Sequence, residues 1–192
     1  AGLLHDSGHG PFSHASEKVA EEKGLSHEDI SCRKVEQLED IIPVDADRIK
    51  KIVHGELEIA QAVAGEIDAD RMDYLQRDAF FSGVEYGNID AETIIRVAEI
   101  DSRRLVFNQK GVQALEGLLT ARFHMIKSVY THHTSKISEK MLQRSLENYL
   151  EQGNNVEKMM KMDDYRAHNQ LLNSEGPAKN IYSRIKDREL YK

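Results

Sequence analysis

Three histidines, an aspartate, two glycines and a proline lie within ten residues in the run HDSGHGPFSH, from His5 to His14. Gly8, Gly10 and Pro11 oppose a continuous helix, so we expect the chain to turn after His5-Asp6 and to begin a helix at Pro11. This places the histidines where two helices meet. Adjacent His and Asp are typical ligands of Mn, Fe, Zn or Mg, and such an ion needs further ligands from elsewhere in the chain.

The composition predicts a mostly α-helical protein. The chain has only three prolines in 192 residues, and it contains no Asn-Gly or Asp-Gly hairpin turn. This length supports one substantial core, so we expect a main helical domain over 1–152 and a smaller helical appendage over 153–192. A lone cysteine, Cys32, allows no internal disulfide and is expected to be a buried or half-buried residue rather than a nucleophile. No apolar run is long enough for a membrane span or signal peptide, which favours a cytoplasmic protein.

Helical periodicity and capping residues locate the expected elements. A small β-hairpin is expected near 98–107, with strands over 98–100 and 104–107. An apolar stripe predicts a long buried helix from Gly111 to Thr131; its members are Val112, Leu115, Leu119, Ile126 and Val129. The other helices are expected at 11–23, 26–39 with Ser26 as cap, 45–53 with Asp45 or Asp47 as cap, 56–64, 70–83, 90–97 with Asp90 as cap, 135–152, 163–172 and 177–186.

The run HDSGHGPFSH resembles the signature of the HD-domain phosphohydrolases, in the branch of the deoxynucleoside triphosphate triphosphohydrolases. The resemblance implies that His5 and Asp6 are metal ligands. Residues 66–78, EIDADRMDYLQRD, resemble the second signature of the family, whose aspartate matches Asp70. No residue matches the family's first metal histidine, and Ala1-Gly2-Leu3-Leu4 resembles the end of an apolar helix, so we expect the chain to be truncated at its N-terminus.

The spacing of Asp70, Tyr74 and Asp78 at i, i+4 and i+8 independently predicts one polar helix face, opposite an apolar strip of Met72, Leu75 and Ala79. That face could line a site, or it could be a solvated acidic helix start.

Hydrolysis of a phosphate ester requires neutralised charge on the phosphoryl group, an activated water and a protonated leaving oxygen. A bound divalent ion would supply the first two, and a histidine is suited to the third. The resemblance implies that His9 carries out proton transfer, oriented by Glu17 and His27. The alternative for Glu17 and His27 is that both are ordinary solvated helix residues.

The resemblance also implies a set of substrate-binding residues: His14 and Arg71 for phosphate, and Tyr74 and Asp78 for the sugar. Arg122 and Tyr130 match a further family pattern, an arginine followed by a tyrosine that lies against the sugar. Arginines are suited to a triphosphate because a guanidinium can grip phosphate through two parallel hydrogen bonds. Tyr130 could instead be a core tyrosine. A family histidine is absent at Ile126, which leaves the choice of substrate open.

These observations predict a metal-dependent phosphohydrolase that cleaves a deoxynucleoside triphosphate to deoxynucleoside and triphosphate. The alternatives are a nucleoside monophosphate or other phosphomonoester hydrolase, and a nucleotide-binding regulatory module without catalysis. The expected cofactor is a divalent ion (Mn, Mg, Fe, Zn or Ni), and the family resemblance implies a homo-oligomer. The net charge of −7, with its acidic excess in residues 1–109, gives no indication of nucleic-acid binding and no membrane is expected as a partner.

Overall fold

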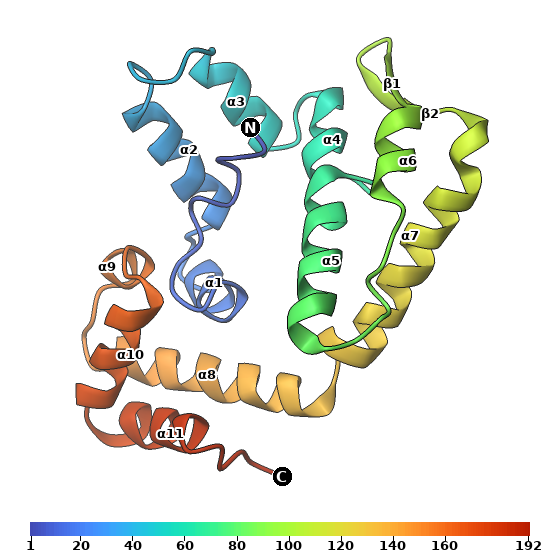
Figure 1. Cartoon of the computed structure of the whole chain (residues 1–192). Helices are drawn as coiled ribbons and strands as arrows, with labels where there is room; N and C mark the ends of the chain where they lie inside the picture. The colour runs from blue at the N-terminus through green and yellow to red at the C-terminus, as the bar shows by residue number, and fades with distance from the viewer. The chain divides into compact units, whose positions relative to one another are not determined.

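The computed structural model describes residues 1–192 and is mostly helical, with a single two-stranded hairpin, which confirms the predicted fold class (Figure 1). No helix combines the length and apolarity needed to cross a bilayer. Short 3₁₀ turns occupy Glu58–Ala60 and Gln109–Gly111. The regular elements are α1 (His14–Glu21), α2 (His27–Gln37), α3 (Ala46–Val53), α4 (Gln61–Ala64), α5 (Ala69–Ser82), α6 (Ala91–Val97), β1 (Ala98–Asp101), β2 (Arg104–Phe107), α7 (Val112–Met125), α8 (His133–Glu151), α9 (Val156–Met160), α10 (Asp164–Asn173) and α11 (Gly176–Lys186).

The chain forms two compact units. The first, which we call the terminal unit, combines Leu3–Ile42 with His133–Lys192. Its α8 packs against both α1 and α11, and its core includes Val19, Leu146 and Leu171. Cys32 is buried in this unit, as expected. The predicted division of the chain at residue 152 stays a prediction.

The second unit, the middle unit, contains Pro43–His132 together with Ala1–Gly2. Its core gathers Leu75, Ile94, Leu118 and Met125 from α5, α6 and α7. The hairpin pairs Ala98 with Phe107 and Asp101 with Arg104, in the predicted place. Its two turn residues, Ser102 and Arg103, have φ values of 48° and 72°. Positive φ at both central positions is typical of a tight hairpin turn, here formed without glycine.

The predicted capping residues are confirmed. The Ser26 hydroxyl accepts a hydrogen bond from the Asp29 amide at 3.1 Å, and Asp90 accepts one from Thr93 at 3.1 Å. Of the two candidates for α3, Asp45 is the cap. A side-chain acceptor at this position satisfies a backbone N–H that has no partner within the helix.

The predicted helix start at Pro11 is wrong, since α1 begins at His14. Phe12 and Ser13 have φ values of 60° and 45°, so the backbone makes another turn before the helix. The Phe12 amide donates to Asp164 Oδ1 at 2.8 Å, a contact across 152 residues that local sequence does not reveal. This contact fixes the turn to α10 and delays the helix.

The long helix predicted from Gly111 to Thr131 is confirmed as a helix but not as a buried one. The α-helical part ends at Met125, and a π-helical turn follows over Ile126–Tyr130. Val112, Leu119 and Ile126 of the predicted stripe are exposed, whereas Leu115 and Val129 are partly buried against the core. The fully buried residues of this helix are instead Leu118, Ala121 and Met125, at i, i+3 and i+7. This helix has apolar residues on two faces, and its neighbours in the middle unit decide which face is buried.

Candidate functional site

The loop that carries His5 to Ser13 is fixed to α2 by a short hydrogen-bond chain. The Gly8 amide donates to Ser31 Oγ at 2.7 Å, and Ser31 Oγ donates to the His5 carbonyl at 2.6 Å. Lys34, one turn further along α2, donates to the Ser7 carbonyl. Gly8 lies so close to α2 that a Cβ atom there would be 2.0 Å from the His27 carbonyl oxygen. The loop and the first turn of α2 are therefore held against each other.

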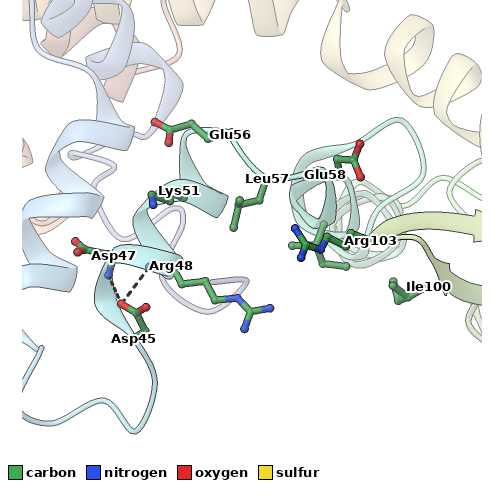
Figure 2. A pocket seen from close by; sticks show the side chains of 10 residues that line it. Asp45, Asp47, Arg48, Lys51, Glu56, Leu57, Glu58, Ile100 and Arg103 are labelled. Carbon is green, nitrogen blue, oxygen red and sulfur yellow. Dashed lines mark hydrogen bonds between the residues drawn. The ribbon is translucent and has the colours of Figure 1, made fainter.

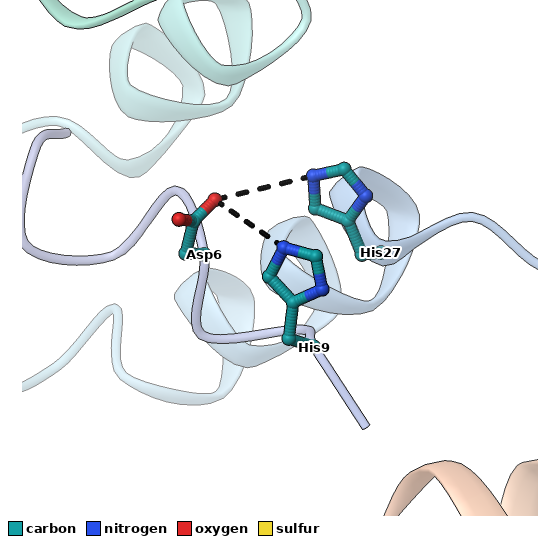
Figure 3. Close-up of side chains that lie close together, drawn as sticks. All are labelled: Asp6, His9 and His27. Carbon is teal, nitrogen blue, oxygen red and sulfur yellow. Dashed lines mark ion pairs between the residues drawn. The ribbon is translucent and has the colours of Figure 1, made fainter. Parts of the chain in front are cut away.

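One carboxylate oxygen of this loop faces three imidazoles. Asp6 Oδ1 lies 3.2 Å from His5 Nε2, 3.8 Å from His9 Nε2 and 4.0 Å from His27 Nε2. Figure 3 shows His9 and His27 pointing toward Asp6 from the loop and from the start of α2. Their rings stack, with centroids 4.3 Å apart and planes 7° from parallel. The predicted residues His5, Asp6, His9 and His27 are thus brought together within the terminal unit.

Glu17, on the first turn of α1, joins two of the histidines. His14 Nδ1 donates to Glu17 Oε2 at 3.0 Å, and Glu17 Oε1 forms a close ion pair with His27 Nδ1. Burial alone would raise the pKa of Glu17, but the His14 hydrogen bond and the charges of His27 and His9 hold it below its usual value. Glu17 is therefore a carboxylate near neutral pH, suited to orient two imidazoles.

His9 is the most enclosed of the three rings around Glu17. Its side chain is 15% exposed, whereas that of His14 is 77% exposed and meets it edge-on at 5.3 Å. Burial lowers the pKa of His9, and the neighbouring His27 lowers it further. The carboxylates of Glu17 and Asp6 act in the opposite sense and favour the protonated ring that proton donation requires.

A second group of predicted residues lies on α5 and at the end of α7, in the middle unit. The Tyr130 hydroxyl donates to Asp78 Oδ2 at 2.7 Å, and the Tyr74 and Tyr130 rings meet edge-on with centroids 6.1 Å apart. Burial and the Asp78 carboxylate raise the pKa of Tyr130, so its hydroxyl remains a hydrogen-bond donor. The π-helical turn carries Tyr130, and such turns are frequent at functional sites.

The predicted phosphate-binding Arg71 and the predicted substrate-binding Arg122 converge on a residue that the sequence did not single out. Arg71 Nη1 and Arg122 Nη1 donate to the same oxygen of Glu66, at 3.0 and 3.2 Å. Asp68, the buried cap of α5, accepts from the Arg71 amide at 2.6 Å and lies 3.8 Å from Arg71 Nε. Glu66 opens the run that resembles the second family signature, but the pairing of this exposed loop residue with an arginine 56 positions away has no local pattern in the sequence.

Comparisons with known proteins show the family of the chain. The HD domain family matches residues 1–78, and the HD associated region matches residues 89–192, more than half of the chain. The chain belongs to the HD-domain proteins that carry an HD associated region. The HD match includes His5, Asp6 and Asp70, and the HD-associated match includes Arg122 and Tyr130.

Individual relatives of this HD-domain chain are longer proteins. It is 35% identical to the uncharacterized protein YwfO of Bacillus subtilis, over 76% of the chain and 35% of that protein. It is 30% identical to the deoxynucleoside triphosphate triphosphohydrolase SAMHD1 homolog of Dictyostelium discoideum, over 74% of the chain and 31% of that protein. The crystal structure of a phosphohydrolase from Bacteroides thetaiotaomicron matches with a TM-score of 0.80 and 31% identity, over 99% of this chain and 56% of that one.

HD domains bind divalent metals, and the donor set of this HD domain suits one. Asp6 and the imidazoles of His9 and His27 offer ligand atoms within 4.8 Å of one another. Imidazole nitrogen with carboxylate oxygen is a donor set that divalent transition metals accept. Asp70, on α5 of the middle unit, stays a predicted ligand on the basis of its motif.

One hollow in the HD-domain chain is separate from the predicted site residues. It has a volume of about 740 Å³ in the middle unit, next to α3 and the hairpin (Figure 2). Arg48, Lys51 and Arg103 line it, but so do four acidic side chains, Asp45, Asp47, Glu56 and Glu58. The balance of charge gives no preference for a phosphate, and we assign no ligand to this hollow.

Proposed function

We propose that the protein to which this chain belongs is a metal-dependent hydrolase of nucleotides that converts a deoxynucleoside triphosphate into deoxynucleoside and triphosphate. The observation that carries the proposal is the convergence of His5, His9 and His27 on one oxygen of Asp6 in an HD-domain chain. The naming of a Dictyostelium relative as a deoxynucleoside triphosphate triphosphohydrolase supports the choice of substrate.

In this proposal His5 and Asp6, together with Asp70 as predicted from its motif, would hold a divalent ion, and when bound that ion would neutralise phosphoryl charge and activate water. Water oxygen bonds to the α-phosphorus, and the bond from that phosphorus to the 5′-oxygen breaks. The 5′-oxygen must take up a proton as it leaves. Arg71, Arg122 and His14 bind phosphate oxygens, because a triphosphate carries more charge than one ion can offset.

The sugar contacts are proposed for the second group of residues. Because Tyr130 already donates to Asp78 Oδ2, the other carboxylate oxygen of Asp78 is available to accept from a sugar hydroxyl. The ring of Tyr130 is held at an angle of 73° to that of Tyr74 and forms a rigid wall next to the Asp78 carboxylate. We propose that this wall excludes a 2′-hydroxyl.

Analysis of the products tests the proposed reaction. The full-length protein should release intact triphosphate and deoxynucleoside from one or more deoxynucleoside triphosphates, in the presence of Mn, Mg, Fe, Zn or Ni and not with a chelator. Separation of products by ion-exchange chromatography identifies them. Release of orthophosphate from nucleoside monophosphates alone would favour the phosphomonoesterase, and nucleotide binding without any product would favour a regulatory module.

Proton transfer is proposed for His9, oriented by Glu17 and His27, and the geometry adds His14 as a second candidate. Glu17 hydrogen-bonds His14 directly at 3.0 Å, and the exposed His14 ring leaves its Nε2 open to a substrate. The residue that donates the proton should matter only when the leaving oxygen is a poor leaving group.

Replacement of each histidine by glutamine distinguishes them. The variant that lacks the donor should lose about 10²- to 10⁴-fold in kcat/KM on a deoxynucleoside triphosphate, but far less on a p-nitrophenyl phosphate ester, whose leaving group needs no proton. The other variant should lose activity on both substrates to a similar degree. Equal losses on both substrates for both variants would contradict proton donation by either histidine.

A further inference from the structure

Glu66 occupies the place where an anionic ligand of Arg71 and Arg122 would lie. The two guanidinium groups come from α5 and α7, and both donate to the same Glu66 oxygen, at 3.0 and 3.2 Å. Two cationic groups this close repel each other unless an anion lies between them. In this structure that anion is a side chain of the protein itself.

The exposure of the three side chains shows which of them can move. The Glu66 side chain is 82% exposed, whereas those of Arg71 and Arg122 are 18% and 30% exposed. Arg71 Nε also lies 3.8 Å from Oδ2 of Asp68, whose side chain is 3% exposed. Glu66 can therefore leave while the arginines stay in place. Glu66 and Arg71 line a hollow of about 460 Å³ beside β2, which gives a ligand access to them.

A phosphate is a better partner for two guanidinium groups than this carboxylate is. An exposed ion pair contributes only about 0–1 kcal/mol, because water screens it and the side chains lose freedom. A phosphoryl group carries more charge and offers separate oxygens to each arginine. A ligand phosphate should therefore displace Glu66, and its binding free energy is reduced by that of the two ion pairs it breaks.

We propose that Glu66 is a built-in competitor for the phosphate-binding arginines, which keeps them paired when no substrate is present and raises the concentration of phosphate ligand needed to fill the site. This inference rests on the proposed function, in that it takes Arg71 and Arg122 as phosphate-binding residues. The inference adds a residue, Glu66, that competes with substrate for the two arginines without touching the bond that breaks.

Binding of inorganic tripolyphosphate to the full-length protein tests the proposal. Calorimetry in metal-free buffer measures binding without turnover. Glu66→Gln should lower the Kd by about three- to tenfold, the equivalent of two weak ion pairs released. The matched control is Asp73→Asn, which removes the same charge from α5, where Asp73 pairs with Arg77 at 2.8 Å. The control should leave the Kd within about twofold of the wild type, because an exposed charge acts weakly at a distance.

A double variant separates local competition from any general effect. In an Arg122→Gln background the gain from Glu66→Gln should shrink, since one of the two broken pairs no longer exists. An unchanged Kd in Glu66→Gln, or an equal decrease of the Kd in Asp73→Asn, would overturn the proposal that Glu66 competes with phosphate. So would a wild type and a variant that both fail to bind tripolyphosphate. If Glu66→Gln binds tripolyphosphate more tightly but the protein hydrolyses no nucleotide, the proposed function is wrong and the proposed competition by Glu66 is retained.

Discussion

Replacing Asp6 by asparagine in the full-length protein is expected to remove its bound metal ion and to lower kcat/KM on nucleotide by about 10²- to 10⁴-fold, equal to several kcal/mol of transition-state stabilisation. Asp6 Oδ1 is the atom that His5, His9 and His27 all approach, within 3.2 to 4.0 Å. Asparagine has nearly the same shape, but its neutral amide cannot balance the charge of a divalent ion.

Metal content measured by inductively coupled plasma mass spectrometry, with activity on the same preparation, checks this result. The exposed Asp40, in the same unit, provides the control. Asp40→Asn should keep both metal and activity. Because Asp6 is half exposed, the Asp6→Asn variant should remain folded, as circular dichroism would show. Full metal content together with full activity in Asp6→Asn would contradict the assignment of Asp6.

Gly8→Ala is expected to destabilise the terminal unit by about 2–4 kcal/mol, because the added methyl group has no room. Its Cβ would lie 2.0 Å from the His27 carbonyl oxygen and 2.6 Å from the Ser31 amide nitrogen. Both atoms belong to the backbone of α2, so no side-chain rotation can relieve the clash. Either the loop that carries His5 to Ser13 or α2 must shift, and the hydrogen bond from the Gly8 amide to Ser31 Oγ lengthens or breaks.

Urea unfolding followed by circular dichroism measures this effect, and Gly117→Ala is its matched control. Gly117 is exposed within α7, and a Cβ there would meet nothing within 4 Å. The same substitution should therefore stabilise the protein by up to about 1 kcal/mol, because alanine favours helix. The two glycines should give effects of opposite sign. A Gly8→Ala variant within about 0.5 kcal/mol of the wild type would show that the loop does not pack on α2 as described.

Local interactions explain which parts of the fold were predictable. Ser26, Asp45 and Asp90 cap their helices because a short polar side chain satisfies a backbone N–H two or three residues away. The hairpin was predictable from its two apolar strands, although its turn residues are unusual. Pro11 failed as a helix start because a contact with Asp164, far along the chain, holds Phe12 in a turn.

The sequence by itself determined the kinds of chemistry available: a helical HD domain, with His5, Asp6, His9 and His27 as candidate ligands and acid–base groups. Spacing along the chain and a family signature carry that information, because ligand type and helix register are local properties. Only the tertiary structure decided which atoms meet. Glu17 lies between His14 and His27, Tyr130 donates to Asp78, and Glu66 neutralises Arg71 and Arg122. These contacts depend on loops and packing between distant elements, which no local pattern in the sequence encodes.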